Sequence, residues 1–197
     1  MLAHGSLRVS HVSTHVALAK APELVTAARL TRVIDLTTDA LARFDIDQPR
    51  IGVAALNPHA GEGGLFGAED ADIISPTVQG YRDRGMDISG PISGDTIFVR
   101  AAAGDFDAVI AMFHDQGHIP VKLLGFQVDP VARRWVSLSG VNVTLGLPFV
   151  RTSVDHGTAF DIAGKGIASP QSMVEAIDYA LTMAAPSKHK EPQPWPQ

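Results

Sequence analysis

Histidines are the residues of this sequence whose positions point most directly to chemistry. His59 follows an apolar run at 51–56, and His114 follows another at 108–113. Both runs predict buried strands. A third histidine, His15, follows a loosely alternating apolar segment near the beginning of the chain. In an α/β protein the carboxyl ends of strands border the crevice that binds ligands. Three neutral imidazoles with an open coordination position there would make a catalytic site for a divalent metal.

The segments around His59 and His114 also allow plainer interpretations. Residues 57–64 hold one proline and three glycines, so this loop can bring its backbone close to a ligand. It can equally be a structural turn that carries a surface histidine. Asp115 can bind a metal, orient a metal-binding histidine or cap a helix. Asp95 lies in a polar turn and is either an acid of the same crevice or a helix cap.

Three further polar side chains interrupt apolar surroundings. Lys122, Asn142 and Arg151 could hold a phosphate or a carboxylate, for which arginine offers a bidentate fork. Each of them could also be a solvated group at the end of an element. The segment 155–168 is rich in small residues but lacks the G-x-G-x-x-G dinucleotide fingerprint. Its glycines allow the backbone to wrap around a flat ring. The alternative is a loop that binds no ligand.

Composition excludes several classes of function. The chain has 197 residues, 45% of them hydrophobic, with 16 basic and 21 acidic side chains and a net charge of −5. It has no basic stripe, so nucleic acid is a poor candidate partner. There is no cysteine, so a metal site must use histidines and carboxylates. No apolar stretch approaches the roughly 18 residues of a membrane helix, and no signal peptide is visible. We therefore expect a cytoplasmic protein without a membrane partner.

Hydrophobic periodicity predicts alternating strands and helices, which is typical of an α/β fold. One or two strands are expected over 7–18. Further strands are predicted over 51–56, 86–88, 108–113 and 141–145, helices over 22–44, 69–84, 96–103, 119–126 and 170–184, and a hairpin or loop over 127–140. From residue 186 onward Lys, Glu, Gln and Pro dominate, which predicts disorder. The strands are too few for a complete doubly wound domain, so we expect the chain to be part of a longer protein.

Three long blocks resemble one known family. They cover residues 56–67, 112–117 and 141–159, and together they are similar to the 4-hydroxythreonine-4-phosphate dehydrogenases of pyridoxal phosphate biosynthesis. The resemblance implies a three-layer α/β fold like that of isocitrate and isopropylmalate dehydrogenases, with the N-terminal part missing. Residues 1–185 would be the C-terminal portion of a two-domain, metal- and NAD-dependent dehydrogenase, and residues 186–197 a disordered tail.

The resemblance also assigns roles to residues. It implies a divalent metal (Zn, Mg, Mn or Co) at a homodimer interface, with ligands from both subunits among His15, His59 and His114. It implies substrate contacts by Lys122, Asn142 and Arg151, and it places the possible catalytic groups Asp95 and Asp115 in the same pocket as Lys122. The segment around residues 156–164 looks like the adenosine-binding loop of isocitrate and isopropylmalate dehydrogenases. The residues implied for NAD binding are His156, Gly157, Thr158, Ala159, Asp161 and Gly164.

The implied reaction is the NAD-dependent oxidation and decarboxylation of a phosphorylated hydroxy acid such as 4-(phosphooxy)-L-threonine. Residues 117–126 and the long segment 127–140 look more like a paralogous branch, which acts on D-threonate or D-erythronate 4-phosphate or on a terephthalate dihydrodiol. The same residues are also compatible with an inactive, metal-binding dimeric fragment or with a metal-dependent hydrolase. The cofactor-like segment 155–168 argues against the hydrolase.

Overall fold

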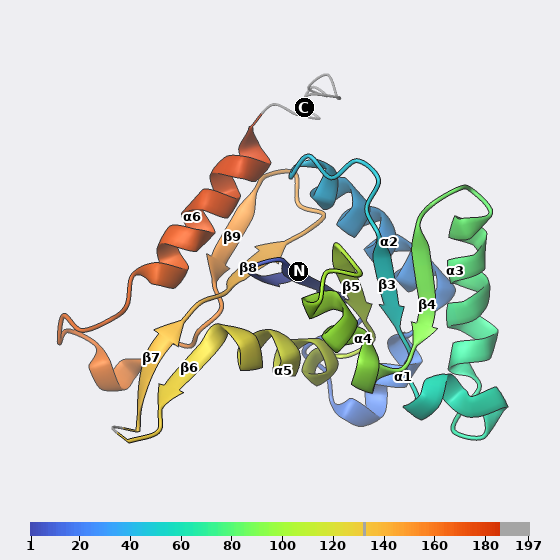
Figure 1. Ribbon diagram of the computed structural model, residues 1–197, viewed down its shortest axis with the longest axis horizontal. Coiled ribbons are helices and arrows are strands. Elements are labelled where there is room, and N and C mark those ends of the chain that lie inside the picture. Colours follow the sequence, from blue (N-terminus) through green and yellow to red (C-terminus); the bar gives the residue numbers. More distant parts are fainter. Residues whose placement is uncertain (132, 186–197) are drawn as a thin grey trace.

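The computed structural model describes residues 1–131 and 133–185, and the tail predicted to be disordered lies outside these residues. Seven strands form one sheet in the order β4-β3-β5-β2-β1-β8-β9 (Figure 1). Their bounds are β1 (Leu2–His4), β2 (Leu7–His11), β3 (Ile51–Ala54), β4 (Ile88–Ile92), β5 (Ala108–Ala111), β8 (Val141–Thr144) and β9 (Arg151–Val154). The helices are α1 (Ala21–Leu24), α2 (Ala27–Ala42), α3 (Ser75–Arg82), α4 (Gly94–Ala102), α5 (His114–Gly125) and α6 (Gln171–Ala184). A separate hairpin consists of β6 (Phe126–Asp129) and β7 (Arg134–Leu138).

The sheet is mixed, with one parallel block. Strands β4, β3, β5 and β2 run parallel, whereas β1 is antiparallel to both of its neighbours and β9 is antiparallel to β8. Strands β3 and β5 are buried along their whole length, as expected of parallel strands that are covered on both faces. The carboxyl ends of the four parallel strands therefore lie along one edge.

Helices cover both faces of the sheet and give three layers, which confirms the α/β prediction. On one face α2 and α3 bury Leu30, Ile34 and Val78 against strands β3 and β5. On the other face α4 and α5 bury Ile97 and Val121 against β2 and β5. Figure 1 shows α4 and α5 in front of the sheet and α2 behind it. Helix α6 packs on β8 and β9 through a third cluster that contains Val141, Val143 and Ala176. No helix within the described ranges is long and apolar enough to span a bilayer.

Two predicted helices have different bounds in the structure. The helix expected over 22–44 is divided, because Thr26 caps α2 by accepting a hydrogen bond from the Arg29 amide at 3.2 Å. The helix expected over 119–126 already begins at His114, so Pro120 lies inside it. The Gln116 side chain fixes this earlier start, because it accepts from the Met112 amide and donates to the Ala55 carbonyl, both at 2.7 Å.

The remaining segments follow the predictions with small shifts. The short strand expected over 86–88 is β4, displaced to Ile88–Ile92, and the predicted hairpin over 127–140 is formed by β6 and β7. Helix 69–84 begins with a π-helical turn at Asp70–Ile74 before α3. Strand β9 was not predicted, because its first residue, Arg151, is charged and exposed.

Candidate active site

Four of the residues singled out in the sequence lie along the carboxyl edge of the parallel block. His15 follows β2, His59 follows β3, Asp95 follows β4 and His114 begins the helix after β5. Because parallel strands end at the same edge, this topology delivers four potential metal or proton-transfer groups to one side of the sheet.

His15 and His114 are neighbours, with ring centroids 5.5 Å apart. Two further imidazoles continue the row inward: His118 stacks on His114 at 3.7 Å, and His11 lies 4.7 Å from His118. Gly117 allows this approach, because a Cβ at that position would collide with the His11 ring. Sequence reasoning missed the two inner histidines. The spacing of His114 and His118, one helical turn, was the available signal.

The inner imidazoles are held neutral by their surroundings. Burial, and then the nearby His118, lower the pKa of His11 to about 3. Burial also lowers the pKa of His118, whose Nδ1 donates to the His114 carbonyl at 2.9 Å. At neutral pH the buried part of the row therefore carries no charge.

Asp115 orients the outermost imidazole of helix α5. The Nδ1 of His114 donates to Asp115 Oδ1 at 2.6 Å, which leaves Nε2 as the nitrogen with a free lone pair. Carboxylates that accept a hydrogen bond from a metal-binding histidine commonly fix the orientation of its ring in this way. The helix-cap interpretation of Asp115 is wrong, because Phe113 occupies the cap position. The cap interpretation of Asp95 is wrong for the same reason, since Ser93 precedes α4 and Asp95 is an exposed residue of the first turn.

Asp70 fixes the beginning of the loop that carries His59. This carboxylate is 1% exposed and accepts hydrogen bonds from the Leu56 and Asn57 amides at 2.8 and 3.0 Å. Residues 59–63 all have positive φ, an arrangement that is unfavourable for the non-glycine residues among them. Sequence reasoning missed Asp70. Its signal was its place between Glu69 and Asp72 at the start of the predicted helix 69–84.

The three predicted metal ligands do not meet within one chain. Across residues 1–131 and 133–185, no group of three His, Asp or Glu side chains could hold a metal ion. His15 and His114 are neighbours. His59 is apart from them, and its ring lies 6.2 Å from that of Phe66. One chain therefore presents two of the three imidazoles as a pair and the third separately.

Lys122 and the predicted cofactor segment line one cavity of about 1040 Å³. The segment contributes His156, Gly157, Ala159 and Asp161, while Thr158 and Gly164 lie in the same stretch of chain without lining the cavity. Apolar side chains complete the walls: Phe126, Trp135, Leu138, Ile162 and Ile167. A space of this size with a few polar groups is typical of a cofactor site.

Asn142 and Arg151 do not line this cavity. Asn142 is half-buried in β8, where it pairs with Leu2 and Ser153, and Arg151 is exposed and donates to Thr144 Oγ1 at 2.6 Å. The structure thus separates the predicted substrate-binding trio.

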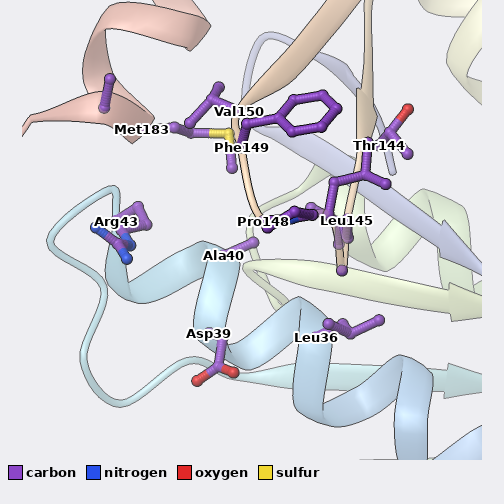
Figure 2. A pocket seen from close by; sticks show the side chains of 13 residues that line it. Leu36, Asp39, Ala40, Arg43, Thr144, Leu145, Pro148, Phe149, Val150 and Met183 are labelled. Carbon is purple, nitrogen blue, oxygen red and sulfur yellow. The ribbon is translucent and has the colours of Figure 1, made fainter. Parts of the chain in front are cut away.

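A smaller cavity of about 500 Å³ lies between α2, the 144–150 segment and the end of α6. Figure 2 shows its mainly apolar side chains, among them Leu36, Phe149 and Met183. Its charged lining residues, Asp39 and Arg43, both come from α2. The cavity contains none of the predicted site residues.

Asp155 is a further acid that sequence reasoning missed. It lies at the end of β9, directly before His156, and its Oδ2 is buried without a hydrogen-bond partner among the described residues. Burial raises the pKa of this carboxyl, although the positive charges of Lys122, His156 and His114 oppose the shift. A half-buried acid with a raised pKa, next to a residue that lines a cavity, is typical of functional sites.

Comparison with known proteins places this architecture in a family. Residues 1–180 match the family described as pyridoxal phosphate biosynthetic protein PdxA. A Bradyrhizobium diazoefficiens protein provisionally named D-threonate 4-phosphate dehydrogenase is 66% identical over 94% of this chain and 54% of its own length. A 4-hydroxythreonine-4-phosphate dehydrogenase of Geobacter metallireducens is 53% identical over 93% of this chain and 51% of its own length.

A solved structure shares the fold. The 4-hydroxythreonine-4-phosphate dehydrogenase of Klebsiella pneumoniae superposes with a TM-score of 0.76 at 42% identity, covering 93% of this chain and 52% of that one. The chain therefore spans about half the length of the relatives that it matches. With a match over nearly its whole length, the chain belongs to the PdxA family.

Proposed function

We propose that this chain is part of an NAD- and divalent-metal-dependent dehydrogenase that oxidises and decarboxylates a phosphorylated hydroxy acid. The observation that carries the proposal is the construction of helix α5. It begins with His114, paired with His15 and oriented by Asp115, and two turns later it places Lys122 in the large cavity. Relatives named as dehydrogenases of two phosphorylated substrates support the same reaction class.

The residues fit a divalent cation if two copies of the chain cooperate. His15 and His114 supply two imidazoles, and the Asp115 contact leaves His114 Nε2 available for coordination. His59 stands exposed on a loop apart from this pair, so we assign it to the site of a partner copy. A cation held there would supply Lewis acidity, which favours loss of a proton from a substrate hydroxyl group. Imidazole ligands favour zinc among the candidate metals.

The large cavity fits a dinucleotide. Part of its lining is the small-residue segment that resembles an adenosine-binding loop, in which Asp161 can accept hydrogen bonds from ribose hydroxyls. Bound NAD would supply the hydride acceptor. We infer the isocitrate dehydrogenase-like, two-domain scaffold on the same basis, with the rest of the relatives' length supplying the other part.

The chain's own residues position the substrate and move its protons. Lys122 can pair with an anionic group of the substrate or transfer a proton at Nζ, and Asn142 and Arg151 are assigned to the phosphate in the assembled enzyme. Asp95 and Asp115 are exposed at the histidine edge, where either can exchange a proton with solvent. A phosphorylated four-carbon acid suits two cations better than a neutral substrate does.

The test is a substrate panel on the full-length protein that carries this chain. NAD reduction is measured with 4-(phosphooxy)-L-threonine, D-threonate 4-phosphate, D-erythronate 4-phosphate and a terephthalate dihydrodiol, with and without added zinc. We expect metal-dependent turnover of a phosphorylated substrate. The higher identity to the relative named for D-threonate 4-phosphate favours that substrate. Turnover of the dihydrodiol alone would contradict the phosphate assignment, and NAD-independent hydrolysis would contradict the dehydrogenase.

A further inference from the structure

The β6–β7 hairpin stands apart from the seven-stranded sheet. Among the residues that the structure describes, its two strands pair only with each other, from Phe126 opposite Leu138 to Asp129 opposite Arg134. An isolated two-stranded hairpin is marginally stable in water, so it normally packs against something else. Figure 1 shows it beyond the end of α5, beside the chain that leads from β9 to α6. Its position in the fold therefore brings it next to the predicted cofactor segment.

The hairpin and the cofactor segment enclose the same cavity. From the hairpin come Phe126, Asp129, Arg133, Trp135 and Leu138, and from the other side come residues between His156 and Ser169. The cavity is therefore shared between a segment that the family resemblance links to adenosine and a hairpin to which that resemblance assigns no role.

Trp135 offers a stacking surface inside this shared space. Its side chain is 61% exposed in a position that lines the cavity. It meets the Phe126 ring edge to face, with centroids 5.9 Å apart and planes at 80°. Phe126 therefore supports the indole ring but does not stack in parallel on its face. Flat heterocyclic bases stack well on such aromatic faces.

Arg133 offers the cavity a cation for a diphosphate. The charged side chains of the lining are Lys122, which we assign to the substrate, Arg133 on the hairpin, and the acids Asp129 and Asp161. The diphosphate of a dinucleotide carries two negative charges, and Arg133 can donate charge-assisted hydrogen bonds to it. Asp161, on the opposite segment, suits a sugar hydroxyl rather than a phosphate.

We propose that the β6–β7 hairpin forms a wall of the nucleotide site, in which Trp135 stacks on the adenine ring of NAD and Arg133 pairs with its diphosphate. This rests on the proposed function, since it takes NAD as the ligand of the cavity. Adenine is chosen over nicotinamide because the segment that faces Trp135 across the cavity is the adenosine-like one. The hairpin thereby becomes an affinity-determining element for the cofactor.

Tryptophan fluorescence tests the proposal without measuring turnover. The sequence has two tryptophans, Trp135 and Trp195. In the full-length protein, Trp195 and any tryptophan outside this chain are replaced by Phe, so that the emission reports Trp135 alone. We expect NAD and AMP to quench this emission saturably and nicotinamide mononucleotide to leave it unchanged. Quenching by nicotinamide mononucleotide but not by AMP would overturn the adenine assignment.

Affinity measurements supply the second test. Calorimetric titration of Trp135→Leu should show NAD affinity reduced by about 5- to 150-fold, as expected for loss of one base stack. Trp135→Phe should restore most of the affinity. Val131→Ala is the matched control: Val131 is 93% exposed at the hairpin turn and does not line the cavity, so its affinity should equal that of wild type. Arg133→Gln should weaken NAD and AMP binding together.

The outcomes separate this inference from the proposed function. If wild type binds NAD by calorimetry but Trp135 is not quenched and Trp135→Leu binds normally, the hairpin assignment is wrong and the dehydrogenase stands. If wild type binds neither NAD nor AMP, both the proposed function and this inference are wrong. If Trp135 emission changes with protein concentration and not with nucleotide, the hairpin contacts a second copy instead, which overturns the proposal.

Discussion

Replacing Asp70 by Ala should be the most damaging single change among the residues that support the histidine edge. Asp70 accepts hydrogen bonds from the Leu56 amide at 2.8 Å, the Asn57 amide at 3.0 Å and the Asn57 side-chain amide at 3.0 Å. It is 1% exposed, so water cannot replace it in the folded protein without rearrangement. Loss of the carboxylate leaves two backbone donors without their partner directly before the His59 loop.

The expected magnitude follows from those donors. Each buried donor left unsatisfied costs about 1–3 kcal/mol, so two backbone donors cost about 2–6 kcal/mol. A domain of ordinary stability has about 5–15 kcal/mol in total. The substitution should therefore remove a large share of the free energy of unfolding. The substitution should also loosen residues 59–63. Their unfavourable left-handed backbone conformation depends on Asn57, directly before the loop, being held in place by its hydrogen bonds to Asp70.

Urea denaturation at pH 7 measures the effect, with Asp72→Ala as the matched control. Asp72 is an exposed acid of the same π-helical turn, and its loss should change the unfolding free energy by no more than about 0.5 kcal/mol. Amide hydrogen exchange should show faster exchange at 56–64 in Asp70→Ala and normal exchange in β5. A loss below about 1 kcal/mol, with an unchanged m-value and unchanged protection of 56–64, would refute the reasoning.

Two further predictions concern charges near the cavity and β9. Because burial raises the pKa of Asp155 above its ordinary value of 3.8, its ionised form is disfavoured in the folded state, and this penalty is present at neutral pH and disappears as pH falls below that value. Asp155→Asn should therefore melt at a higher temperature than wild type at pH 7 and show a smaller advantage at pH 4, whereas an equal difference at both pH values would contradict a titrating carboxyl. Arg151→Ala in the full-length enzyme should weaken binding of the phosphorylated substrate about ten- to a hundredfold, as expected for a lost charge-assisted contact. Thr144→Val removes the hydrogen-bond partner of Arg151 without removing the cation, so it should have a much smaller effect on the substrate Kd, and equal effects would indicate a structural role for Arg151.

Much of the architecture was predictable because strong apolar periodicity decides it. The runs at 51–56 and 108–113 gave β3 and β5, and their positions before His59 and His114 predicted the functional edge. The predicted start of helix α5 was wrong because Pro120 looked like a first-turn residue. In the structure the helix begins earlier, because the Gln116 side chain forms hydrogen bonds with the backbone just after strands β5 and β3. That contact joins residues 61 positions apart, and no local pattern reveals it.

The site was predictable in its parts but not in its assembly. Histidines at strand ends are visible in the sequence, and so is Asp115 beside His114. The approach of His118 to His11 and the burial of Asp155 Oδ2 depend on how α5 packs on the sheet and on where β9 ends. The separation of His59 from the His15–His114 pair depends on a loop whose shape is set by Asp70. Such long-range contacts carry no signature in local residue spacing.

Subunit mixing tests the central claim, a metal site shared between two copies, most directly. In the full-length protein His59→Ala removes one ligand from every site, and His114→Ala removes another, so each variant alone should lose most of its bound metal and its NAD reduction. In a mixed dimer one site combines the intact His15–His114 pair of the first variant with the intact His59 of the second. Random pairing makes half of the dimers mixed, and each has one complete site of two, so the mixture should recover about a quarter of the wild-type metal content. No recovery in verified mixed dimers would contradict the shared site, and full metal content in either single variant would contradict the ligand assignment itself.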